Sequence, residues 1–203
     1  MSKSEAPGRL NSPQPRRSQS RGVKRARELL DIATELFIKK GIEETTIDDI
    51  VAHAGTAKGT FYHHYPSKAE LLLAIRRAHL DDFDAYVEEE LEKQTSDDPV
   101  VGLETWVRAT CEAYALMVDR QDIAFSGAGF RWTPRDMSHM EDLVALLKRG
   151  NQRKSWHVGD VYNVAIFIEK GTLGVMDDLI LTNKSLKDAY RTVIGMVRGI
   201  VGL

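Results

Sequence analysis

Apolar side chains recur at intervals of three and four residues along most of the chain after Val23. Between residues 26 and 37 they form a single stripe, and Gly41 stands where a helix would end. This interval is typical of an amphipathic α-helix, whereas the alternation of a half-buried strand is not found. The pattern predicts an all-α fold.

Caps and helix breakers mark three further helices. Thr46 and Ser67 each stand directly before a helical pattern and have an acidic residue three positions later, as N-cap residues do. Gly55 permits a tight turn between a short helix and a second one at residues 57–64, which Pro66 closes. Two short helices joined at a glycine turn and braced by longer helices indicate a helix-turn-helix DNA-binding unit.

The second short helix is rich in hydrogen-bond donors on the side away from Phe61, which we expect to face the core beside Ile50. No acidic residue occurs between Val51 and Lys68. Donors without carboxylates suit the anionic phosphate backbone of DNA, although a solvated helix face has a similar composition. The donors are Thr56, Lys58, Thr60, Tyr62, His63 and His64.

The residues from Arg25 to Leu71 resemble the DNA-binding signature of the TetR family of bacterial transcriptional regulators. The resemblance rests on the Thr46 cap, on Ala-Gly in the turn, on Lys-Gly-Thr-Phe-Tyr at residues 58–62 and on the Ser-Lys-x-Glu-Leu opening of the next helix. It implies an N-terminal helix-turn-helix three-helix DNA-binding domain, followed by a helical ligand-binding and dimerisation domain. The rest of the chain resembles the family in length and helical character alone.

The resemblance also implies which residues contact DNA. Thr46 would offer its hydroxyl and backbone N–H to a phosphate, and the start of the second short helix would enter the major groove. At Gly59, as at Phe61, turn geometry or core packing explains the residue equally well. Ala57 departs from the family, which often has serine there. The implied DNA contacts are Thr46, Thr56, Ala57, Lys58, Gly59, Thr60, Tyr62, His63, His64 and Lys68.

The C-terminal part shows four more helical patterns, at residues 100–118, 134–150, 158–181 and 185–203. The last carries an apolar stripe that a monomer could bury on its own core. The resemblance implies instead that the last two helices pair with a second subunit, and a short recognition helix needs a two-fold partner to read two half-sites of DNA. The stripe comprises Leu186, Tyr190, Val193, Val197 and Ile200.

The family resemblance places an effector pocket among the central helices, with an apolar lining and a small, apolar effector. The candidates for this pocket are Phe125, Trp132 and Met140, although such residues are more often core. The acidic pairs at residues 81–82 and 177–178 are interpreted as solvated helix faces.

Charge is distributed unevenly along the chain. The formal net charge of the whole chain is -2, yet residues 1–77 carry 14 Lys and Arg against 9 Asp and Glu. Residues 1–22 are basic, rich in proline and serine and poor in apolar side chains, so we expect a flexible tail there. The single cysteine, Cys111, and the lack of a spanning segment favour a reducing, cytoplasmic setting.

No catalytic motif, metal-ligand spacing or cofactor loop is found, so we expect no enzyme, metal or cofactor. We predict a tail (1–22), a DNA-binding domain (23–70) and an effector-binding and dimerisation domain (71–203). The predicted function is a TetR-like regulator, most often a repressor, that binds a palindromic double-stranded DNA operator as a homodimer and is released by an effector. The alternative is a ligand-sequestering or protein-interaction module that does not read DNA, and a helical enzyme is the third class considered.

Overall fold

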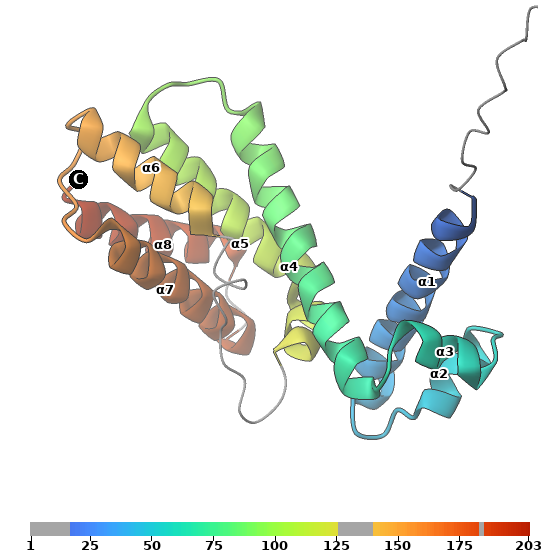
Figure 1. The fold of residues 1–203 in the computed structure, drawn as a ribbon. Coiled ribbons are helices and arrows are strands. Elements are labelled where there is room, and N and C mark those ends of the chain that lie inside the picture. Colours follow the sequence, from blue (N-terminus) through green and yellow to red (C-terminus); the bar gives the residue numbers. More distant parts are fainter. Residues whose placement is uncertain (1–16, 126–139, 183–184) are drawn as a thin grey trace, which may run out of the picture.

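The computed structural model describes residues 17–125, 140–182 and 185–203, and this part of the chain contains eight α-helices and no strand (Figure 1). The all-α prediction is therefore confirmed. None of these helices is long and apolar enough to cross a membrane. The helices are α1 (Arg17–Lys40), α2 (Ile47–His53), α3 (Lys58–His64), α4 (Lys68–Lys93), α5 (Pro99–Ala124), α6 (Glu141–Gln152), α7 (Val161–Thr182) and α8 (Leu186–Val201).

The predicted caps set the boundaries of α2 and α4. The Thr46 hydroxyl accepts a hydrogen bond from the Asp49 N–H, and the Asp49 carboxylate accepts one from the Thr46 N–H in return. The Ser67 hydroxyl accepts from the Glu70 N–H at 3.1 Å. Each bond satisfies an N–H that the first turn of a helix leaves without an intrahelical partner.

The first helix starts earlier than expected, because α1 begins at Arg17 rather than at Val23. The prediction of a flexible tail is therefore wrong for residues 17–22. No proline follows Pro15 in this stretch, and adding a residue to an existing helix costs far less than starting one. Residues 1–16 lie outside the described part of the chain.

A small core holds α1, α2, α3 and the beginning of α4 together. Ile50 of α2 and Phe61 of α3 are both fully buried in it, as expected, against Leu29, Ala33 and Phe37 of α1. Since α2 and α3 have seven residues each, packing against α1 and α4 supplies the stability that such short helices lack on their own. We call this unit, which extends to Ile75, the small domain.

Helix α4 joins the small domain to the rest of the molecule (Figure 1). Leu71 and Ile75 belong to the small core, whereas Phe83 and Val87 of the same helix belong to a second, larger core. The predicted domain boundary at residue 70 therefore falls inside a continuous helix. A continuous helix transmits movement between the two cores more directly than a flexible linker.

The larger core lies between the second half of α4 and helices α5 to α8, and α5 contacts each of the others. We call this unit the large domain. Trp156, after α6, is buried and donates a hydrogen bond from Nε1 to the Leu147 carbonyl at 3.0 Å. Its ring covers Gly150, where a Cβ atom would lie 1.9 Å from Cε2 of the ring. This contact requires glycine at position 150.

The stripe predicted for dimerisation does not lie on one outer surface. Val193 and Val197 are buried in the larger core, and Leu186 and Tyr190 are partly buried against it. Only Ile200 of this set is exposed. The stripe faces α5 and α7 because a single protomer already needs an apolar face of α8 to close its own core.

Candidate nucleic-acid interface and ligand pocket

Helix α3 is anchored through one side chain and presents the others outward. Phe61 is 0% exposed, and the Tyr62 ring stands edge-on to it at a centroid distance of 5.6 Å. Lys58, Tyr62 and His63 are exposed, whereas Thr60 and His64 are partly buried. The donor-rich side of α3 is therefore available to a partner, as the sequence pattern predicted.

Gly59 has neither of the two structural reasons that the sequence left open. Its backbone is helical, since the positive-φ glycines among the described residues are Gly41, Gly55 and Gly202. A Cβ atom placed on Gly59 meets no described atom within 4 Å other than those of its chain neighbours and the backbone of its own helix. Because glycine in a helix costs up to about 1 kcal/mol relative to alanine, the residue suits a close approach by another molecule. For Phe61, by contrast, core packing is a sufficient explanation.

Ala57 occupies the N-cap position of α3 and has no polar side chain with which to cap the helix. A serine there would accept a hydrogen bond from the first turn, as Ser67 does in α4. This departure from the family pattern therefore leaves the start of α3 with exposed backbone N–H groups. Such groups can donate to a phosphate.

Lys58 is held by a carboxylate in the free protein. Its Nζ lies 2.8 Å from Oδ1 of Asp48 on α2, and this pairing raises the pKa of Lys58 above its ordinary value. Both side chains are exposed, so the pair contributes little stability and is readily exchanged. The lysine is thus oriented along the outer side of α2 and α3 and is charged at every physiological pH.

The donors of Thr46 are also occupied. Its N–H and hydroxyl both donate to Oδ2 of Asp49, at 2.9 Å and 2.8 Å. These hydrogen bonds, with a contribution from Lys40, lower the pKa of Asp49 to about 2. Thr46 therefore meets the expected phosphate only if the capping contact is shared or exchanged.

Lys68, the first residue of α4, lies beside the loop before α2. Its Nζ is 3.4 Å from the Glu43 carbonyl oxygen and 6.0 Å from the centroid of the Phe37 ring. Tyr65, directly after α3, donates from its hydroxyl to the Ala26 carbonyl at 2.9 Å. These contacts fix the end of α3 against α1 and keep the charge of Lys68 close to the α2–α3 surface.

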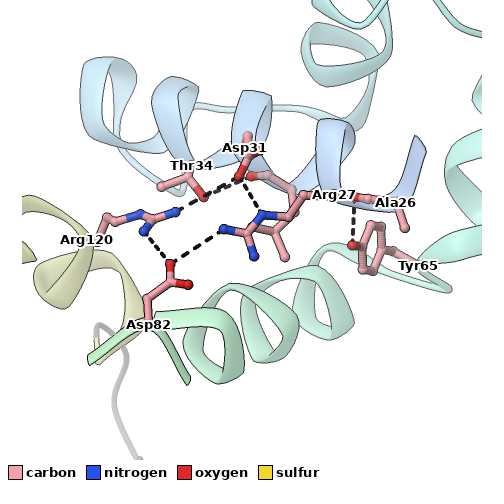
Figure 2. A network of polar contacts seen from close by, with 8 residues as sticks. Ala26, Arg27, Asp31, Thr34, Tyr65, Asp82 and Arg120 are labelled. Atoms are coloured by element: carbon pink, nitrogen blue, oxygen red, sulfur yellow. Dashed lines mark hydrogen bonds and ion pairs between the residues drawn. The ribbon is translucent and has the colours of Figure 1, made fainter. Parts of the chain in front are cut away.

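A chain of ion pairs joins the small domain to the large domain (Figure 2). Asp82 of α4 lies 2.8 Å from Arg120 of α5 and 3.5 Å from Arg27 of α1. Asp31 of α1 contacts Arg27 at 3.2 Å and Arg120 at 4.0 Å. Three helices, α1, α4 and α5, therefore meet at four charged side chains.

A cavity of about 380 Å³ lies in the large domain next to this network. Gln121 and Asp122, the two residues after Arg120, line it from α5, and Glu169 and Asp177 line it from α7. His79, from α4, lines it as well. The cavity is therefore in direct contact with the helix that carries one end of the ion-pair network.

The lining of this cavity differs from the apolar lining that was expected. Phe125 contributes a ring, as predicted, but Met140 is buried elsewhere and does not line the cavity. Trp132 lies outside the described residues. The helical repeat places carboxylates of α5 and α7 on the cavity side, and the Tyr114 hydroxyl donates to one of them, Asp177.

Residues 81–82 and 177–178 were interpreted from the sequence as solvated helix faces. Asp81, Asp177 and Asp178 are exposed, but Asp82 joins the ion-pair network and Asp177 also lines the cavity. Adjacent residues of an α-helix point about 100° apart. Only the packing of α5 against α4 and α7 shows which acid of a pair contacts other residues. Among the described residues no group of three His, Cys, Asp or Glu is placed to hold a metal ion.

The small domain is similar to known proteins. Residues 29–75 match the family model described as bacterial regulatory proteins, tetR family. The transcriptional repressor KstR2 of Rhodococcus jostii is 47% identical over 58 residues, which cover 29% of this chain and 28% of that protein.

The similarity then extends into the large domain. KstR2 of Mycobacterium tuberculosis is 32% identical over 165 residues, which cover 79% of this chain and 75% of that repressor. The solved structure of a SmeT–triclosan complex shares the fold with a TM-score of 0.66 and 20% identity, over 87% of this chain and 90% of that one.

Proposed function

Because the chain belongs to the tetR family of bacterial regulatory proteins, it is a DNA-binding transcriptional regulator and not an enzyme, and we propose that it acts as a repressor. In this proposal a homodimer binds a palindromic operator in the cytoplasm, and a small molecule bound in the large domain releases it. Repression is proposed because the relatives that share most of the chain carry the name of a repressor.

The observation that carries the proposal is the outward face of α3, which has donors and an open glycine but no carboxylate. Helix α3 enters the major groove, with Gly59 against the DNA and Lys58 transferred from Asp48 to a base edge or phosphate. Lys68 and the first-turn N–H groups of α3 donate to phosphates and fix the register.

Two copies are needed because seven residues of α3 read only a few base pairs, whereas a two-fold dimer places the second copy about 34 Å along the duplex. We assign the dimer contact to the outer faces of α7 and α8 in place of the buried stripe. Phe167 and Leu181 of α7 are 66% and 85% exposed, and Met196 and Ile200 of α8 are exposed as well. Apolar area of this kind on a soluble protein favours association with a second copy.

Release follows from linkage between the cavity and the spacing of the two α3 helices. A ligand that touches Gln121 and Asp122 shifts α5, and Arg120 passes the shift to α1 and α4 through Asp31 and Asp82. Since the DNA fixes the spacing of its half-sites, a ligand that prefers another spacing lowers DNA affinity by its differential binding energy.

The test is a binding assay with DNA from upstream of the protein's own gene. We expect the full-length protein to bind this DNA more tightly than scrambled DNA of the same composition, and its affinity to fall steeply as salt is raised. Equal affinity for the two DNAs at every salt concentration would contradict the proposal and favour a sequestering or protein-interaction module.

The dimer assignment has its own test, by analytical ultracentrifugation. Phe167→Asp should move the protein toward monomer because it places a charge in the proposed interface. Leu116→Asp is the matched control, since Leu116 is similarly exposed but lies on α5. Dissociation caused equally by both changes would contradict the assignment to α7 and α8.

A further inference from the structure

The cavity of the large domain contains more negative than positive charge. Three of its lining residues, Asp122, Glu169 and Asp177, carry carboxylates, and one, Lys170, carries an ammonium group. Lys170 Nζ lies 2.9 Å from Oε2 of Glu169, so the positive charge is used within this pair. The lining, as far as the structure describes it, therefore has an excess of two carboxylates.

Two arginines lie near the cavity, but neither of them lines it. Arg120 is paired with Asp82 and Asp31, outside the cavity. Arg76 does not line the cavity, and its guanidinium lies 5.6 Å from the centroid of the Phe125 ring. The ring that borders the cavity thus already attracts one cation, as an aromatic face does.

His79 adds a second, independent feature. It lines the cavity, is 2% exposed, and has no hydrogen-bond partner at Nδ1 among the described residues. Burial lowers the pKa of His79 to about 4, while a hydrogen bond with the Gln121 side chain opposes this shift. The ring is therefore neutral near physiological pH, and a neutral imidazole has one nitrogen that donates and one that accepts.

The remaining walls are aromatic or aliphatic. Phe83, Tyr114 and Phe125 supply rings, and Leu80 and Leu173 supply aliphatic surface. Carboxylates, a neutral imidazole and aromatic faces around one cavity attract an organic cation with N–H donors, whereas the carboxylates repel an anion. A neutral apolar molecule fills the space but leaves the polar groups without partners.

We propose that the effector is a protonated hydrophobic amine, with its ammonium group toward Asp122, Asp177 and His79 and its apolar body against the rings. This inference rests on the proposed function, since it names the chemistry of the ligand that releases DNA. It replaces the apolar effector that the sequence alone predicted.

Three compounds that share the same apolar group test whether the cavity prefers a positively charged ligand. Tryptamine, tryptophol and indolepropionate carry a cation, a neutral hydroxyl and an anion on the same indolylethyl group. Titration calorimetry with the full-length protein should show tryptamine binding about tenfold or more tightly than tryptophol, and indolepropionate most weakly. Equal affinities, tighter binding of indolepropionate, or no binding of tryptamine would overturn the proposal.

Substitutions of lining residues test whether the preference for tryptamine arises in the cavity. Asp122→Asn and Glu169→Gln should each lower the tryptamine-to-tryptophol affinity ratio about three- to tenfold. Glu88→Gln, an equal charge change on the exposed side of α4 and away from the lining, should leave the ratio unchanged. Asp122 is exposed, so its substitution tests the idea even if the buried Glu169 is needed for folding. A ratio unchanged in Asp122→Asn would overturn the proposal.

The calorimetric titration contains no DNA, so it fails or succeeds independently of operator binding. If the protein prefers tryptamine but does not distinguish its upstream DNA from scrambled DNA, the proposed regulatory function is wrong and the proposed class of ligand stands. If the protein binds its upstream DNA specifically but does not prefer tryptamine, the regulatory function stands and the proposed class of ligand is wrong.

Discussion

The small and large domains differ in what surrounds their helical glycines, and two glycines show the contrast. In the large domain, Gly150 is required by the protein itself, because the Trp156 ring occupies the place of a side chain. In the small domain, a side chain on Gly59 would meet no described atom. The fold therefore requires glycine at position 150, whereas at position 59 we propose that DNA requires it.

The same contrast holds for charge. Lys58 and Asp48 of the small domain form an exposed ion pair, which we propose is exchanged for DNA, whereas Glu169 of the large domain is 3% exposed and lies beside Lys170. Exposed pairs contribute little to stability, so their residues are free to serve binding. Glu169 is one of the three carboxylates that line the cavity proposed for the effector.

The largest expected effect is on Gly150→Ala. The new methyl would lie 1.9 Å from the Trp156 ring, so the ring must move and lose its hydrogen bond to Leu147. We expect the free energy of unfolding to fall by about 3 kcal/mol or more. Urea unfolding followed by circular dichroism measures this, and a loss below about 1 kcal/mol would show that the contact is not required.

The second expected effect is a pH dependence of stability that arises from His79 in the large domain. The folded pKa of His79 is about 4, below its ordinary value of 6.5, so between these values the unfolded chain binds a proton that the folded chain does not. The stability is complete above about pH 6.5 and decreases as the pH falls toward 4. We expect a loss of about 2 kcal/mol between about pH 7 and pH 5.

Urea unfolding at the two pH values measures this loss. His79→Gln should remove most of the dependence, because glutamine does not take up a proton. His63→Gln in the small domain, where the ring is exposed, should retain it. The interpretation fails if the two variants lose stability equally on acidification.

Gly59→Ala should separate stability from function. Alanine favours the helix, so thermal stability should be unchanged or higher by up to about 1 kcal/mol. The added methyl on the DNA side of α3 should weaken operator binding about tenfold. Fluorescence anisotropy with labelled operator DNA measures the second effect, and binding that is not weakened would contradict a close approach of DNA to Gly59.

The smallest expected effect is a gain from Ala57→Ser. A serine hydroxyl at the N-cap of α3 would accept a backbone N–H and add about 0.5 to 1 kcal/mol to the free energy of unfolding. The midpoint of urea unfolding measures this gain. Ala57→Gly is the matched control, because glycine favours the N-cap through its backbone alone and has no hydroxyl to accept the N–H.

The small domain could be predicted from the sequence in detail because its signals are local. Thr46, Gly55 and Ser67 each fix a boundary within a few residues of themselves, and the donor face of α3 follows from one buried residue, Phe61. The domain limits were less predictable. Nothing local to residue 70 shows that α4 continues from one core into the other.

The large domain could be predicted only as a set of helices. Val193 and Val197 have the pattern of an interface and of a core alike, and the packing of α8 against α5 and α7 decides between them. Asp177 and Asp178 are adjacent, yet Asp177 alone lines the cavity. Periodicity shows that a helix has two sides, but the neighbouring helices determine what each side contacts.

The central claim is that α3 reads DNA sequence, and Lys58→Ala tests it most directly. Affinities for upstream and scrambled DNA are measured for the wild type, for Lys58→Ala and for Lys68→Ala across a salt series. We predict that Lys58→Ala reduces the preference for upstream DNA about ten- to a hundredfold, while Lys68→Ala weakens binding to both DNAs alike and flattens the salt dependence. A preference for upstream DNA that Lys58→Ala leaves intact would contradict the account.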